Sequence, residues 1–302
     1  MSQFALSLLC APSSPAQIST IDARLVASAL GATGPVKKLG PGAFEFPIEV
    51  ASPSDIEPLL QAAKTQIGDA PVDINLLALA GRRKRLLIAD MDSTMIQQEC
   101  IDEIAAVAGV GDHVAGITER AMRGELDFNE ALNERVLLLK GLDEAKLSEV
   151  FEKRINVMPG ARTLVQTMKK NNAFCALVSG GFTFFTTRIA EKIGFDINQA
   201  NTLEIVDGRL TGQVVSPILG QQAKLNALEK FSAEKKIPID ETLAVGDGAN
   251  DLAMLNAAGL GVAYHAKPIV AAQARAKIEH NDLTALLYLQ GYTHEEMAHY
   301  AT

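Results

Sequence analysis

The stretch RLLIADMDST, residues 85–94, decides the fold. Its apolar run, Leu86–Ala89, is typical of a buried parallel strand, and the acids Asp90 and Asp92 follow where that strand ends. Open α/β sheets bind their ligands at this edge. Because two carboxylates this close repel each other, they stay ionised together only beside a cation, and an oxygen-rich site suits Mg²⁺. The stretch therefore predicts a ligand site with a magnesium ion at a strand end.

The composition limits the class of protein. A chain of 302 residues is long for one core, so two or three domains are expected, and 48% hydrophobic with 21% charged residues is typical of a globular protein. The formal net charge of −8 argues against nonspecific binding to nucleic acid or to an anionic membrane. Three widely spaced cysteines without metal-ligand spacing fit a reducing compartment, so we expect a cytoplasmic protein.

Residues 1–80 are predicted to form a separate α+β unit. Strands are expected over 4–9, within 36–50 and over 72–79, with helices over 14–30 and 52–67. This βαββαβ order is the ferredoxin-like plan, and it resembles the ACT regulatory domains of amino-acid enzymes. The resemblance leaves small-molecule sensing and a homodimer through this unit both open. The basic segment 81–85 that follows is interpreted as a solvated linker, since the chain as a whole is acidic.

The remainder is predicted to be an α/β core with a helical insertion. Residues 98–155 have a helical pattern with expected breaks at Gly109, Gly116, Gly124 and Gly141. From residue 156 onwards, strands alternate with helices, which indicates a Rossmann-like, doubly wound parallel sheet. The predicted core therefore comprises residues 81–97 and 156–302, and residues 98–155 form a cap over the strand ends.

Two further predicted strands of the core also end in polar turns. The strand over 174–178 runs into Ser179 and Gly180, where a hydroxyl and a backbone without Cβ can approach an anion. The strand over 243–245 runs into GDGAND, in which Asp247 and Asp251 lie four residues apart at a helix start and can face one point. Lys224 lies in the first turn of another predicted helix, which is understandable if an anion is bound there.

Together, DMDST at 90–94, Ser179-Gly180, Lys224 and GDGAND at 246–251 resemble the four motifs of the haloacid dehalogenase superfamily in order and spacing. Within that superfamily, the acid at position 92 resembles the phosphatase type. The resemblance implies an aspartyl-phosphate mechanism with Mg²⁺. The implied roles are Asp90 as nucleophile and metal ligand, Asp92 as general acid/base and backbone metal ligand, Asp247 as metal ligand, Asp251 as holder of the metal's waters, and Ser179, Gly180, Lys224 and Asn250 as phosphate or substrate ligands.

Residues of the predicted cap limit the class of possible substrates. Glu99 and Arg135 match positions that phosphoserine phosphatases use to hold the amino acid, and a carboxylate with a guanidinium fork suits a zwitterion. Met122 and Phe128 match apolar positions that close over a small substrate, although both could equally be cap core. The resemblance thus implies hydrolysis of O-phospho-L-serine, the last step of serine biosynthesis, by an enzyme that binds neither nucleic acid nor membrane.

Other interpretations stay open at this stage. The same motifs would serve a phosphatase or phosphotransferase for another small phosphometabolite, such as phosphohomoserine. A binding or regulatory protein could retain the fold without catalysis. Individually, the aspartates could be turn and helix-capping residues, and Glu99 and Arg135 could be surface charges of the cap.

Overall fold

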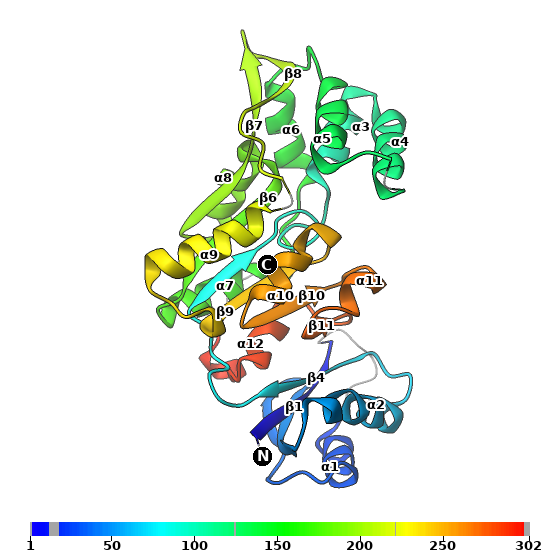
Figure 1. Cartoon of the computed structure of the whole chain (residues 1–302), viewed down its shortest axis with the longest axis vertical. Coiled ribbons are helices and arrows are strands. Elements are labelled where there is room, and N and C mark those ends of the chain that lie inside the picture. The colour runs from blue at the N-terminus through cyan, green and yellow to red at the C-terminus, as the bar shows by residue number, and fades with distance from the viewer. Residues whose placement is uncertain (1, 12–17, 124, 221, 299–302) are drawn as a thin grey trace.

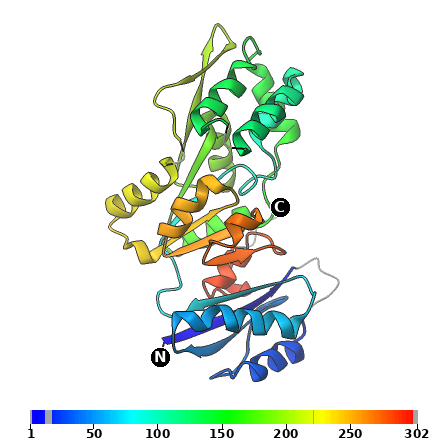
Figure 2. The ribbon, with the colours of Figure 1, turned by 45° about the vertical axis from the view of Figure 1, so that its right-hand side comes forward.

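The computed structural model describes residues 2–11, 18–123, 125–220 and 222–298. The molecule is elongated, with the N-terminal sheet at one end, the α/β core in the middle and a group of helices at the other end (Figures 1 and 2). Within the described ranges, no helix combines the length and hydrophobicity that a bilayer-spanning segment requires.

The N-terminal unit has the predicted βαββαβ order. Its four strands form an antiparallel sheet in the order β2-β3-β1-β4. The bounds are β1 (Ser2–Cys10), α1 (Thr20–Ala29), β2 (Lys37–Gly40), β3 (Ala43–Val50), a one-turn helix (Pro53–Asp55), α2 (Ile56–Ile67) and β4 (Val72–Ala78). The first helix was expected from residue 14, but residues 12–17 lie outside the described part. Helix α1 begins after Ser19, whose hydroxyl accepts a hydrogen bond from the Asp22 N–H.

The face of the N-terminal sheet that carries Asp73 and Asn75 packs on the core through buried polar contacts. The Asp73 carboxylate on β4 accepts hydrogen bonds from the backbone N–H groups of residues 279–281. The Asn75 amide bonds both backbone groups of Lys277, which lies in β11 (Ala276–Ile278). Because buried polar groups are stable only when paired, these contacts hold the sheet in one orientation on the core.

The prediction of a solvated linker over 81–85 is wrong for two of its residues. The Arg82 guanidinium lies 2.6 Å from the buried Glu45 carboxylate of β3. The Lys84 ammonium is also buried and donates to the backbone oxygens of Gly81 and Asp240. A buried carboxylate needs a cation, and Arg82 of this segment supplies it. The segment therefore joins the N-terminal sheet to the core through ion pairing and hydrogen bonds.

The core is the predicted doubly wound sheet. Seven strands lie in the order β11-β10-β9-β5-β6-β7-β8, and all neighbours are parallel except the β7-β8 hairpin. The other strands are β5 (Leu86–Ala89), β6 (Phe174–Phe182), β7 (Ile197–Val206), β8 (Arg209–Val215), β9 (Thr242–Gly246) and β10 (Leu260–Tyr264). The helices are α7 (Ala161–Lys170), α8 (Thr183–Ile193), α9 (Ala223–Lys235), α10 (Leu252–Ala257), α11 (Pro268–Ala271) and α12 (Ala285–Leu289), with one-turn helices at Ile239–Glu241, Ala249–Asp251 and His294–Glu296.

The central strand β5 is buried on both faces. Leu86 and Ile88 pack in the hydrophobic cluster that includes α9 and α10, whereas Leu87 and Ala89 pack in the cluster that includes α7 and α8. This two-sided burial explains why the strand is a continuous apolar run rather than an alternating one.

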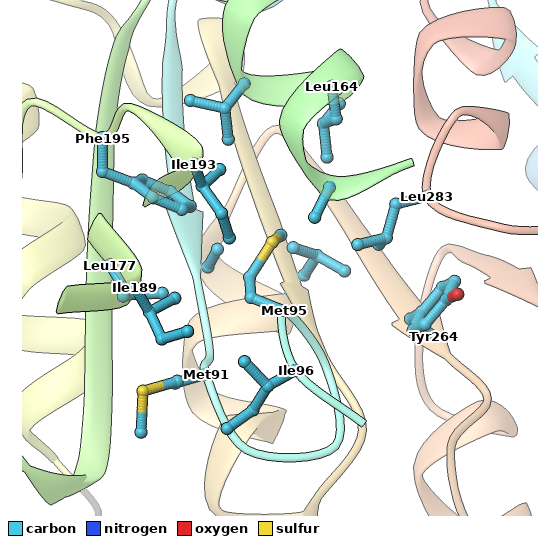
Figure 3. Packing of buried hydrophobic residues seen from close by; sticks show 14 of the residues in the cluster. Met91, Met95, Ile96, Leu164, Leu177, Ile189, Ile193, Phe195, Tyr264 and Leu283 are labelled. Atoms are coloured by element: carbon cyan, nitrogen blue, oxygen red, sulfur yellow. The ribbon is translucent and has the colours of Figure 1, made fainter. Parts of the chain in front are cut away.

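The loop after β5 is anchored by apolar side chains. Met91, Met95 and Ile96 are fully buried among side chains such as Leu177 and Ile189 (Figure 3). Each such side chain contributes roughly 1.5–3 kcal/mol relative to exposure. Met91 lies between the two acids, and Met95 and Ile96 follow them, so burial of these side chains holds the backbone that carries the acids.

Between β5 and α7, the described part of the chain forms four helices, α3 (Cys100–Ala108), α4 (Gly111–Met122), α5 (Phe128–Leu137) and α6 (Ala145–Arg154). The breaks at Gly109 and Gly141 are confirmed, and both residues have positive φ angles, of 74° and 84°. The break at Gly116 is wrong, because this residue lies inside α4, where a glycine weakens a helix without ending it. Gly124 lies outside the described residues. The two ends of the insertion meet at a bridge between Ile96 and Val157.

Candidate active site

The acids predicted to share a metal do converge. Asp90 follows β5 and Asp247 follows the adjacent parallel strand β9, so both lie at the carboxyl ends of neighbouring strands. Carboxylate oxygens of Asp90, Asp247 and Asp251 all lie within 4.8 Å of one another. Gly246 makes this approach possible, because a Cβ at that position would lie 2.5 Å from an Asp251 carboxylate oxygen.

Lys224 lies among these acids. Its Nζ is 2.8 Å from Asp90 Oδ2 and 2.6 Å from Asp251 Oδ1, and all three side chains are buried. Burial by itself lowers the pKa of Lys224, but the two carboxylates more than offset that effect and raise the pKa. The position of Lys224 in the first turn of a helix predicted a nearby anion, and the Asp90 and Asp251 carboxylates are part of that negative charge.

The local charge suits a divalent cation. Burial and, after it, the Asp251 carboxylate raise the pKa of both Asp90 and Asp247. When all three carboxylates are ionised, the one ammonium leaves two of their negative charges uncompensated at this largely buried site. Hard oxygen donors at this spacing fit the preferences of Mg²⁺. The donor set therefore fits the ion predicted from the sequence.

Asp92 is held at the rim of this cluster. Its Oδ1 accepts a 2.8 Å hydrogen bond from the Cys100 N–H, and its Oδ2 accepts one of 3.2 Å from Ser179 Oγ. Burial raises the pKa of Asp92, while the bonds from Cys100 and Ser179 lower it. Gly181 lies so close that a Cβ there would be 2.7 Å from Asp92 Oδ2. The carboxyl group is thus fixed beside Ser179, where a proton donor to a bound phosphate ester would be needed.

Two contacts of the site involve residues to which the sequence assigned no role. Thr94 Oγ1 donates a 3.0 Å hydrogen bond to Asp247 Oδ1, and its side chain is fully buried. The Cys100 N–H orients Asp92, as described above. Thr94 lies within the DMDST motif, so its place in the motif was a usable signal, whereas the backbone donor at Cys100 had none.

A cavity of about 1440 Å³ lies between the strand ends and the helical insertion. The predicted residues that line it are Asp90, Asp92, Glu99, Phe128, Arg135, Ser179, Gly180, Asp247 and Asn250, and Lys224 borders an adjoining small pocket. Met122 ends helix α4, but its side chain lies outside what the structure describes. Asp251 is fully buried beneath the cavity, behind Lys224.

Glu99 and Arg135 both face this cavity. Ser93 Oγ donates to Glu99 Oε1 at 2.7 Å. Although Glu99 is exposed to the cavity, the enclosing walls and, next, the Asp92 carboxylate raise its pKa to about 7. Partial burial lowers the pKa of Arg135, and its Nε donates to the Ala131 oxygen within its own helix. Its remaining donors are therefore able to bind a ligand in the cavity.

Phe128 covers the turn after β6. A Cβ at position 180 would lie 2.9 Å from Cζ of the Phe128 ring, so the ring rests on the glycine backbone. Asn250 lies beside it in the lining of the adjoining pocket. The helical insertion thus closes directly over the Ser179-Gly180 turn.

Known proteins share this arrangement of sequence and fold. The family model of haloacid dehalogenase-like hydrolases matches residues 87–256, more than half of the 302 residues. The chain belongs to this haloacid dehalogenase-like family. The prediction of the superfamily and of its α/β fold is therefore confirmed.

Individual relatives of this haloacid dehalogenase-like chain include phosphoserine phosphatases. One, from Streptomyces coelicolor, is 47% identical over 257 residues, 84% of this chain and 62% of that protein. A crystal structure of a HAD family hydrolase from Salmonella enterica serovar Typhi has a TM-score of 0.82 and 30% identity, and the match covers 96% of this chain and 98% of that one. A structure described as the phospho-aspartyl intermediate analogue of phosphoserine phosphatase has 43% identity and a TM-score of 0.63, covering 68% and 98%.

The chain spans only about three fifths of the length of the first curated relatives that it matches, at 62%, 59% and 58%. The activity of the full-length relatives is therefore assigned to this chain only as a proposal.

Proposed function

We propose that this protein is a Mg²⁺-dependent phosphatase that hydrolyses O-phospho-L-serine to L-serine and phosphate. The observation that carries the proposal is one cavity that contains the Asp90, Asp92 and Asp247 carboxylates together with the Glu99 and Arg135 pair. The first three suit phosphoryl transfer, and the last two suit an amino-acid zwitterion. Relatives named phosphoserine phosphatase support the same activity.

The magnesium ion would be held by the Asp90 and Asp247 carboxylates and by the backbone oxygen of Asp92, with Asp251 near its waters. When bound, it supplies positive charge for the phosphoryl oxygens. Thr94 keeps Asp247 in place through its 3.0 Å hydrogen bond. Lys224 neutralises part of the remaining charge through its contacts with Asp90 and Asp251.

In the first chemical step, a carboxylate oxygen of Asp90 attacks phosphorus in line with the seryl oxygen. The new O–P bond makes an aspartyl phosphate, and the bond from phosphorus to the seryl oxygen breaks with its electron pair on that oxygen. Asp92 donates a proton to the departing oxygen. The raised pKa of Asp92 supports this acid role.

In the second step, the Asp92 carboxylate removes a proton from water, and the water oxygen attacks the phosphorus of the aspartyl phosphate. The Asp90–phosphorus bond breaks, which restores Asp90 and releases phosphate. Ser179 Oγ, the Gly180 N–H and Lys224 Nζ stabilise the phosphoryl charge in both steps, and Asn250 braces the same group.

The amino-acid end of the substrate would be bound by the helical insertion. Glu99 pairs with the ammonium group, and Arg135 binds the carboxylate through its guanidinium fork. Phe128 closes over the phosphate turn and excludes water from the reaction. Met122 is proposed as a second apolar wall.

A different small phosphometabolite, such as phosphohomoserine, is a second candidate substrate for the same chemistry. The cavity of about 1440 Å³ is larger than the roughly 300–1,000 Å³ common for small-ligand sites, so it leaves room for the longer side chain of phosphohomoserine.

The proposal is tested by phosphate release from phosphoserine, measured with and without Mg²⁺. We expect release by the native protein only with the metal, and none by Asp90→Asn. A panel that includes phosphohomoserine and a small aryl phosphate separates the two substrate candidates. Phosphoserine turnover that is lost in Arg135→Ala while aryl phosphate is still hydrolysed supports the first. An absence of Mg²⁺-dependent release from every substrate would favour a non-catalytic binding protein.

The wider context is also proposed. The chain is divided into an ACT-like unit over 1–80, a core over 81–97 and 156–302, and a cap over 98–155. The N-terminal unit is proposed to mediate a homodimer. The predicted setting is the cytoplasm, in serine biosynthesis, and the three buried cysteines, none of them in a disulfide, are consistent with it.

A further inference from the structure

The phosphate turn is a bulge in the sheet. On β6, Val178 pairs with Gln199 of β7, and the next pair is Phe182 with Asn201. The first strand thus advances four residues while the second advances two, and residues 179–181 leave the ladder. A bulge redirects side chains at active sites but leaves backbone groups without ladder partners.

The Asn201 side chain supplies partners at this bulge. Its Nδ2 donates to the Gly180 oxygen at 2.9 Å and to the Leu219 oxygen at 3.3 Å. Its Oδ1 accepts a 2.7 Å hydrogen bond from the Leu219 N–H. The residue is only 1% exposed, so water does not compete for these bonds. One buried amide therefore ties the bulge of β6 to residue 219 of the loop between β8 and α9.

Both tied segments support the proposed phosphate site. The Gly180 peptide is part of the turn over which Phe128 lies. On the other side, Leu219 precedes Gly220, whose oxygen accepts from the Ala223 N–H at the start of α9, one residue before Lys224. A Cβ on Gly220 would lie 3.9 Å from the same Phe128 ring. Asn201 thus links the phosphate turn, the helix start that carries Lys224, and the surface on which the cap closes.

We propose that Asn201 is a positioning residue for phosphoryl binding, although it does not touch the reacting atoms. It holds the Gly180 peptide and the Leu219 loop in the orientation that binds the phosphate group and receives Phe128. This inference rests on the proposed phosphatase function, because it assigns a role toward the same phosphate.

Two substitutions at this position separate the contacts. Asn201→Asp keeps an acceptor for the Leu219 N–H but turns a carboxylate oxygen toward two carbonyl oxygens, which repels both segments. Asn201→Ala removes all three bonds. Asn198→Ala is the control on the same strand, because Asn198 Oδ1 accepts hydrogen bonds from the Thr186 and Thr187 hydroxyls of α8, whereas Asn201 bonds the bulge.

The kinetic test uses the full-length protein with Mg²⁺. Loss of one buried hydrogen bond with its partner left unpaired corresponds to about a tenfold change. We therefore expect the inhibition constant of inorganic phosphate and the KM values of phosphoserine and aryl phosphate to rise about tenfold or more in both Asn201 variants. The two substrates should be affected equally, because the defect lies at the phosphate end. Asn198→Ala should lower the unfolding temperature with unchanged phosphate inhibition.

The outcomes distinguish this inference from the proposed function. Folded Asn201 variants that match the native protein in phosphate inhibition overturn the role of Asn201 while phosphoserine hydrolysis stands. If the native protein hydrolyses nothing, calorimetric titration with inorganic phosphate and Mg²⁺ tests the role of Asn201 in phosphate binding. Phosphate binding that is lost in Asn201→Asp then supports the inference, and a native protein that binds no phosphate overturns it. If Asn201→Ala does not fold, Asn201→Asp carries the test.

Discussion

Replacement of Lys224 by Met is the most severe test of the charge balance at the site. The change removes one ammonium and both of its contacts, at 2.8 Å to Asp90 and 2.6 Å to Asp251, in a place where the side chains are 8% exposed or less. Removing one partner of a buried ion pair costs about 3–5 kcal/mol, because the remaining charge stays buried. In a chain of this size that corresponds to roughly 6–20 °C in unfolding temperature.

The assay is thermal unfolding in metal-free buffer and then in rising Mg²⁺. Without metal, we expect Lys224→Met to lose the full stability of the ion pair. Mg²⁺ should stabilise this variant more than it stabilises the native protein, because the carboxylates of the variant are otherwise uncompensated. At 100 times the dissociation constant, a bound ion contributes about 2.7 kcal/mol. Turnover should fall by roughly 10²- to 10³-fold, as for the loss of a charge that stabilises a transition state.

Two controls accompany this prediction. Lys230→Met removes a lysine from the same helix whose side chain is 54% exposed, so it should change stability by about 0.5 kcal/mol or less. Lys224→Met combined with Asp251→Asn should recover part of the loss, because it removes one of the uncompensated carboxylates. A metal-free Lys224→Met protein that unfolds within a degree or two of the native protein would refute the buried charge balance.

Three further predictions follow from single contacts. Gly181→Ala places a Cβ 2.7 Å from Asp92 Oδ2 and 3.0 Å from Ser179 Oγ, so kcat should fall about 10²-fold and phosphate inhibition should also weaken. Because the pKa of Glu99 is raised to about 7, its carboxyl becomes neutral as the pH falls below that value. As the pH is lowered from 8 to 6, the ratio of the KM for phosphoserine to the KM for aryl phosphate should therefore rise. Arg82→Ala leaves Glu45 buried without its cation and should lower the free energy of unfolding by about 3–5 kcal/mol in denaturant titration.

Each of these has a matched comparison. Gly116→Ala adds a Cβ in open space and should leave kcat unchanged, so an equal loss in both glycine variants would contradict the steric explanation. Glu99→Gln should abolish the pH dependence of the KM ratio, and a slope that persists would assign it to another group. Arg83→Ala, whose ion pair is 46% exposed, should lose about 1 kcal/mol or less, and a loss as large as that of Arg82→Ala would rule out burial as the cause.

Much of the fold and the acidic site could be predicted from local patterns. The apolar run 86–89 predicts a central strand, and acids at the ends of two parallel strands must share one edge of the sheet. The order of the motifs then brings Asp90 and Asp247 together, as the 4.8 Å cluster shows. These predictions succeed because they depend on short segments and on a topological rule rather than on particular side-chain contacts.

Other features depended on contacts between distant residues. Segment 81–85 has the composition of a solvated linker, yet Arg82 meets a buried carboxylate 37 residues earlier in the chain. Gly116 has the same identity as the glycines that end helices, but its place in the packed α4 keeps it helical.

Asn201 shows the limit of sequence reasoning most clearly, since nothing near it distinguishes it from any polar residue of a strand. The sequence by itself determined the strand, the motifs and their common edge, because backbone periodicity is a local property. The tertiary structure alone decided that one amide would meet Gly180 and Leu219, 21 and 18 residues away, because a bulge leaves particular backbone groups to be satisfied and only the folded chain shows which side chain reaches them.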